Sequence, residues 1–219
     1  TQSAEGNVSV NLLGPGNAEF LSPEAGRLRV LQDTDYPFDG RIRVQVTPER
    51  SARFAVSIRI PQWAEGATLQ VNGMPHAATI VAGSYAIIER EWNAGDEILL
   101  DLPMVPIAHG QVQQSTQESF APDGSPVRQQ VMHYEYIAVT RGPLVYASDL
   151  VDGYKTGETL QWLRVGQADN EQGPAVQLCS LGRTPLTLVP YYRTGGRIDG
   201  AWRLTWMSLA PALSRDTVE

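Results

Sequence analysis

Two groups of acidic residues contain the carboxylates that an acid–base hydrolysis would need. Glu89 and Glu91 flank Arg90 and share one face of a predicted strand. Asp33, Asp35 and Asp39 lie within "QDTDYPFDG". A sugar-cleaving pair places its two carboxyls roughly 5–10 Å apart across a cleft. Glu89 and Glu91 precede a turn, however, and Asp beside Pro or Gly is a common turn former. We therefore expect structural roles for both groups and assign no catalytic residue to this chain.

The histidines and the cysteine lack the spacing of a metal site. His76, His109 and His133 lie far apart, and none is close in sequence to a second His or Cys. Cys179 is the single cysteine, so it can form neither an intrachain disulfide nor a cysteine-based zinc site. Its apolar neighbours in "AVQLCSLG" favour a buried structural thiol. The sequence predicts no metal ion and no cofactor in this chain.

Aromatic side chains offer a different chemistry, the stacking of sugar rings. An aromatic face packs against the C–H face of a sugar, while a phenol or indole N–H can bond its hydroxyls. Tyr191, Tyr192 and Trp206 are the candidate sugar-contacting residues. Trp63 and Trp92 stand next to the ends of predicted strands, and we expect both of them in a hydrophobic core.

Composition and charge exclude several classes of partner. The chain has 219 residues, a net charge of −7 and a pI near 5.0, which oppose binding to nucleic acid or to an anionic membrane surface. No apolar run reaches the ~18 residues of a membrane helix. The first residues, "TQSAEGNVSVNLL", include neither an initiator Met nor a signal peptide, so we expect the chain to be part of a longer protein.

The elements that would position these residues are strands. In "GRIRVQVT", "ARFAVSIRI", "SYAIIER" and "DEILLDLP", apolar and polar residues alternate with a period of two. Turn residues separate these segments, and Asn72-Gly73 is a strong hairpin signal because both residues tolerate positive φ. The pattern predicts an all-β chain made of two tandem antiparallel β-sandwich domains.

The predicted domains differ in composition from the segment between them. We assign residues 1–106 to the first β-sandwich and residues 131–219 to the second. Residues 107–130 are rich in Gln, Ser and Pro and show no apolar period, which is typical of a long connection or an exposed loop.

Five segments in this order carry a resemblance to a known family. They are "QDTDYPFDGRIRVQV", "FAVSIRIPQWAEGATLQVNG", "GSYAIIEREWNAGDEILLDLPM", "IAVTRGPLVYASD" and "LTLVPYYRTGGR". Together they resemble the C-terminal β-sandwich region of the bacterial β-L-arabinofuranosidase family of glycoside hydrolases. The resemblance extends over residues 7–209.

The resemblance implies a larger enzyme in which an α-helical barrel carries the active site. That barrel holds a zinc ion through several Cys and a Glu, and one of those Cys is the nucleophile. None of these residues has a counterpart here, since the chain has one Cys, Cys179, and no barrel. The implied role is a non-catalytic accessory region, inactive alone, that supports the barrel, shapes its substrate cleft or forms a homodimer interface. The alternative is a carbohydrate-binding module that stacks sugars on exposed aromatics.

Overall fold

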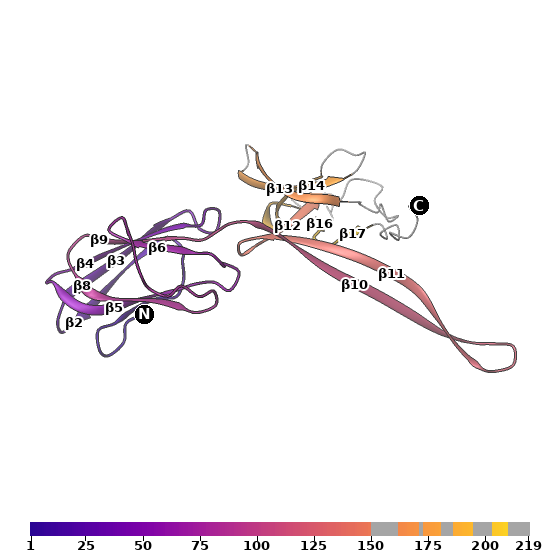
Figure 1. The fold of residues 1–219 in the computed structure, drawn as a ribbon, viewed down its shortest axis with the longest axis horizontal. Coiled ribbons are helices and arrows are strands. Elements are labelled where there is room, and N and C mark those ends of the chain that lie inside the picture. Colours follow the sequence, from indigo (N-terminus) through magenta and orange to yellow (C-terminus); the bar gives the residue numbers. More distant parts are fainter. Residues whose placement is uncertain (150–161, 171–172, 181–185, 195–202, 210–219) are drawn as a thin grey trace. The chain divides into compact units, whose positions relative to one another are not determined.

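The chain divides into two compact units, Thr1–Met104 and Val105–Glu219 (Figure 1). The structure is a computed structural model that describes residues 1–149, 162–170, 173–180, 186–194 and 203–209. The division falls after Met104, where the sequence predicted the first domain to end at residue 106. Within the described residues, no helix is long and apolar enough to span a membrane.

The first unit contains nine strands in two sheets. Their bounds are β1 (Val8–Val10), β2 (Gly16–Ser22), β3 (Gly26–Thr34), β4 (Arg41–Pro48), β5 (Ala52–Arg59), β6 (Thr68–Val71), β7 (Met74–Pro75), β8 (Tyr85–Trp92) and β9 (Asp96–Asp101). One sheet has the order β1-β5-β8 and the other β2-β3-β4-β9-β6-β7. β1 pairs with β5 in parallel, which departs from the predicted antiparallel arrangement; the other pairs in this unit are antiparallel.

A single hydrophobic core lies between these two sheets. The alternation in β4 buries Ile42, Val44 and Val46 completely, and the alternation in β5 buries Val56 and Ile58 in the same cluster. Each strand therefore places one face inward and one face toward solvent, as a sandwich requires. The predicted β-sandwich is confirmed for this unit. Its strands β2 and β3 were not singled out from the sequence.

The turn between β6 and β7 is the one that the sequence predicts. Asn72 and Gly73 have φ values of 51° and 78°, the positive values of a tight hairpin turn. The Asn72 side chain also holds the neighbouring β8–β9 turn, since its Nδ2 donates to Asp96 Oδ1 at 2.9 Å and its Oδ1 accepts from Glu97 N at 2.8 Å. Two hairpins are thereby joined by one residue.

The described part of the second unit is also built of strands, with one short 3-10 helix. The bounds are β10 (Pro106–Phe120), β11 (Pro126–Arg141), β12 (Leu144–Asp149), β13 (Trp162–Asn170), β14 (Gly173–Ser180), β15 (Leu186–Pro190), η1 (Tyr191–Arg193), β16 (Arg203–Leu204) and β17 (Met207–Leu209). The strands run in the order β10-β11-β12-β15-β14-β13, with β16 on β12 and β17 on β11. All of these pairs are antiparallel. The predicted all-β fold class is confirmed.

The second unit has a separate core. The buried members of its core cluster come from five different strands, and they are Ile137, Val139, Tyr146, Val176, Leu188 and Met207. Strands far apart in sequence therefore pack their apolar sides onto a common centre.

The prediction of a long connection or exposed loop over residues 107–130 is wrong in its secondary structure. These residues form most of a long hairpin in which Pro106 to Phe120 pair with Arg141 to Pro126. Figure 1 shows β10 and β11 running beyond the other strands of their unit. Among the described strands, none pairs with the outer part of this hairpin as a third strand, and its two strands are joined by backbone hydrogen bonds.

Candidate functional site

Two of the acidic residues considered for catalysis make local contacts in the structure. Glu89 lies on the outer side of β8, where its Oε1 is 3.2 Å from Arg53 Nε. Asp39 Oδ1 accepts a hydrogen bond from the Arg41 backbone N–H at 3.1 Å, as a turn-forming Asp does. Both Glu89 and Glu91 are exposed.

The two histidines whose side chains are described each make a separate local contact. His76 Nδ1 accepts a hydrogen bond from Ala78 N at 3.0 Å, and His109 Nε2 lies 2.8 Å from Thr140 Oγ1. The side chains of His133 and Cys179 lie outside the described residues, so the predicted burial of the thiol stays a prediction. Across the part of the chain that the structure describes, no three His, Cys, Asp or Glu side chains could hold a metal ion together.

The three aromatic candidates, by contrast, meet in one place. Tyr191 and Tyr192 lie on η1, and Trp206 lies in the turn between β16 and β17. All three line one open hollow of about 690 Å³ in the second unit. We call this the aromatic hollow. Their contact with a sugar stays a prediction.

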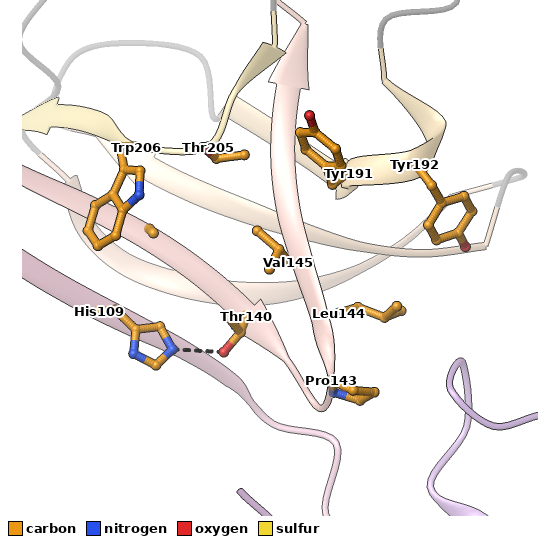
Figure 2. A pocket seen from close by; sticks show the side chains of 10 residues that line it. His109, Thr140, Pro143, Leu144, Val145, Tyr191, Tyr192, Thr205 and Trp206 are labelled. Carbon is orange, nitrogen blue, oxygen red and sulfur yellow. Dashed lines mark hydrogen bonds between the residues drawn. The ribbon is translucent and has the colours of Figure 1, made fainter. Parts of the chain in front are cut away.

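Strands of the central sheet provide the remaining walls of the aromatic hollow. Figure 2 shows Trp206 and His109 on one side and the two tyrosines on the other, with Val145 between them. Alternation explains the floor: Tyr146 of β12 is buried in the core, so its neighbour Val145 points the other way and is 43% exposed. The sequence did not single out His109 or Val145 for this site, although the alternation in "PLVYASD" places Val145 and Tyr146 on opposite faces.

The position of the tyrosine pair is fixed by the end of η1. The Thr194 hydroxyl donates to the Tyr191 carbonyl at 2.8 Å, and the Thr194 backbone N–H donates to the same carbonyl at 3.2 Å. Thr194 is itself buried, and Leu188 anchors the preceding strand β15 in the core. The two rings are therefore carried by a backbone that is held at both ends.

The electrostatics next to the aromatic hollow come from one buried phenol and two arginines. Burial raises the pKa of Tyr146 above its ordinary value, and the charges of Arg141 and Arg193 oppose that rise. A phenol with a raised pKa stays neutral at physiological pH. It therefore acts as a packing and hydrogen-bonding group of the core, and the aromatic hollow gains no acid or base from it.

Both halves of the chain match models of one family. Residues 7–104 match the beta-L-arabinofuranosidase GH127 middle domain, and residues 127–208 match the glycoside hydrolase family 127 C-terminal domain. The matches follow one another without overlap, and each lies within one of the two units. They define two β domains of one glycoside hydrolase family. The chain belongs to glycoside hydrolase family 127, and the catalytic barrel of that family is not among the matched regions.

Known proteins show the same relationship. The chain is 34% identical over 143 residues to a non-reducing end beta-L-arabinofuranosidase from Bifidobacterium longum, covering 62% of this chain and 18% of that enzyme. A structure described as a glycoside hydrolase is 27% identical, with a TM-score of 0.62 over 94% of this chain and 36% of that one. A GH127 beta-L-arabinofuranosidase from Geobacillus stearothermophilus T6 shares the fold at 22% identity, with a TM-score of 0.67 over 96% of this chain and 34% of that one. The chain thus spans about a fifth to a third of these relatives.

Proposed function

We propose that this chain is a non-catalytic accessory region of a larger glycoside hydrolase, in which it supports a catalytic helical barrel. The observation that carries the proposal is the order of the family matches, a middle domain followed by a C-terminal domain. The chain covers 18% of the Bifidobacterium enzyme, so most of such an enzyme lies outside the matched region. A middle domain implies that the remaining part includes a domain ahead of Thr1.

The placement of the reactive side chains supports this role. A catalytic pair has to be held in a cleft by surrounding groups, whereas Glu89 is paired with Arg53 on an exposed strand face. By the family resemblance, the zinc ion, its ligands and the nucleophile belong to the barrel. We assign the hydrolysis of β-L-arabinofuranosides to the larger enzyme and no step of it to this chain.

The carbohydrate-binding module is the less favoured alternative. The family matches account for both units as domains of the enzyme itself. A sugar site also needs several polar groups beside its aromatic rings, because each sugar hydroxyl that loses water requires a partner. The floor of the aromatic hollow is instead formed by apolar groups, such as Leu144 and Val145.

The activity of the isolated chain tests the proposal. The 219-residue chain and the Bifidobacterium enzyme would be assayed at equal concentrations with 4-nitrophenyl β-L-arabinofuranoside. We expect release of nitrophenol by the relative and none above the buffer control by this chain. Turnover at an ordinary enzyme rate, roughly 1 per second or more, would contradict the proposal.

Two further properties can be measured on the same sample. Calorimetric titration with L-arabinose tests the module alternative, because saturable binding that is lost in Trp206→Ala would favour it. Static light scattering tests the prediction of a homodimer, which we retain as part of the proposal.

A further inference from the structure

The aromatic hollow concentrates apolar side chains that are only partly shielded from water. Val145, Tyr191, Tyr192 and Trp206 are 43, 44, 53 and 41% exposed, and all four line it. Single exposed apolar residues are common on protein surfaces, but a group of large ones around a concave floor is typical of an interaction site. The backbone that carries the two tyrosines is already held in place by Thr194. Less conformational entropy is therefore lost when a partner docks.

The polar groups of the aromatic hollow argue for a protein occupant over a sugar. His109 and Thr140 bond to each other at 2.8 Å, so part of their hydrogen-bonding capacity is already used inside the wall. Leu144, Val145 and the faces of the aromatic rings offer dispersion contacts, and none of these surfaces carries a strong hydrogen-bonding group. Apolar side chains from another protein surface would match this lining, because they need no polar partner.

We propose that the aromatic hollow is the docking site for the domain that precedes Thr1 in the full-length enzyme, and that it receives a cluster of apolar side chains from it. This inference rests on the proposed function. The occupant follows from what lies outside the chain: the matched regions are the middle and C-terminal domains, and they leave about two thirds of the structural relatives ahead of or around them. A domain that is supported by this chain needs an apolar surface to pack against, and the aromatic hollow offers one.

The size of the aromatic hollow sets how much of the partner enters. The volume of the aromatic hollow, about 690 Å³, is several times that of one apolar side chain. One side chain would leave most of that space filled with water against apolar walls. We therefore expect two or more apolar side chains to enter, with Trp206 and Tyr192 as the residues that lose the most exposure.

Hydrogen exchange provides the first test. The 219-residue chain and the full-length protein would be compared for peptides that contain Leu144–Val145 and Trp206, and for a control peptide at the hairpin turn, residues 121–125. We expect slower exchange at the aromatic hollow, by about tenfold or more, only in the full-length protein. Equal exchange in both proteins would overturn the inference.

A charge placed in the aromatic hollow provides the second test. Val145→Glu in the full-length protein would leave a carboxylate buried under the docked domain, which is costly. Phe120→Glu is the matched control. It introduces the same carboxylate at an exposed apolar residue of the same unit that lies outside the aromatic hollow. We expect Val145→Glu to speed limited proteolysis between the domains by about tenfold and Phe120→Glu to leave it unchanged. A milder variant, Tyr192→Ser, covers the case in which Val145→Glu fails to fold, as judged by circular dichroism of the 219-residue chain.

The outcomes separate this inference from the proposed function. If removal of residues 1–219 abolishes stability or activity of the full-length enzyme while both aromatic-hollow variants behave as wild type, the docking site lies elsewhere and only the inference fails. If the removal has no effect, the proposed function fails as well. Saturable binding of L-arabinose that Trp206→Ala abolishes, with no protection in the full-length protein, would replace the protein occupant by a sugar.

Discussion

Among the described residues, Trp92 is the largest fully buried side chain, and its surroundings explain why a Trp stands before a turn. Its ring packs against Phe54, with 6.1 Å between centroids, and its Nε1 donates to the Phe54 carbonyl at 3.0 Å. The Arg90 guanidinium lies 5.3 Å from the ring, within the range of a cation–π contact. The prediction that Trp92 is a core residue is confirmed. Trp63 is only partly buried, although it packs against the same core.

We expect Trp92→Ala to lower the free energy of unfolding of the first unit by about 3–5 kcal/mol, through lost burial and the cavity that remains. Trp63→Ala should cost clearly less, because its ring keeps part of its contact with water in the folded state. Urea unfolding followed by far-UV circular dichroism measures both. Equal losses for the two variants would contradict the difference in burial.

Asp96 makes the stability of the first unit depend on pH. Burial acts to raise its pKa, but hydrogen bonds from the Asn93 N–H and the Asn72 amide, together with the Arg90 charge, lower it below the ordinary value. A carboxyl whose folded pKa is depressed stabilises the fold above the unfolded pKa, near 3.9, and this contribution is lost as the pH falls through the lower folded pKa.

Asp96→Asn should therefore flatten the decline in stability of the first unit below about pH 4. Thermal unfolding of wild type and variant between pH 2 and 6 measures this change. Parallel curves for the two proteins over the acid range would show that Asp96 has an ordinary pKa.

Gly40, in the turn before β4, lies so close to the end of β9 that there is no room for a side chain. Gly40 is buried, and a Cβ at this position would collide with the Leu102 carbonyl oxygen and lie 3.0 Å from Met104 Cγ. The same strand ends are joined by a hydrogen bond from Leu102 N to Gly40 O at 2.9 Å. The end of β9 and the start of β4 are therefore held together by backbone contact.

Gly40→Ala should destabilise the first unit by about 1–3 kcal/mol, since the backbone has to move to admit the methyl group. Gly14→Ala is the control, because no atom lies within 4 Å of a Cβ at that position. We expect it to be neutral or slightly stabilising, by up to ~1 kcal/mol. A comparable loss in both variants, measured by chemical denaturation, would argue against a specific clash at Gly40.

Elements with one buried face could be predicted from the sequence, and elements without one could not. β4 and β5 show the alternation because their inner faces meet the core. The outer part of the β10–β11 hairpin pairs with no third strand among the described residues, and its Gln- and Ser-rich segment resembled a loop. Tyr191, Tyr192 and Trp206 were identified from the sequence as separate residues. That they line one hollow depends on the pairing of β12 with β15 and β16, strands that lie more than forty residues away in the sequence.

At the scale of the whole molecule, the two units have separate cores, and each contains its own set of buried strands. A unit that buries its apolar faces within itself can fold alone. We expect residues 1–104 to give a cooperative unfolding transition when expressed without the second unit. A noncooperative transition, or near-UV circular dichroism without the signal of a buried Trp92, would show that the first unit depends on its neighbour.

The most direct test of the accessory role compares the full-length enzyme with a version from which residues 1–219 have been removed. The quantity to measure is the half-life of arabinofuranosidase activity at a temperature just below the melting point of the full-length protein. The account predicts that the truncated barrel loses its activity at least tenfold faster, or fails to fold, while the isolated 219-residue chain stays inactive. Equal half-lives for the two proteins would contradict the claim that these domains support the catalytic barrel.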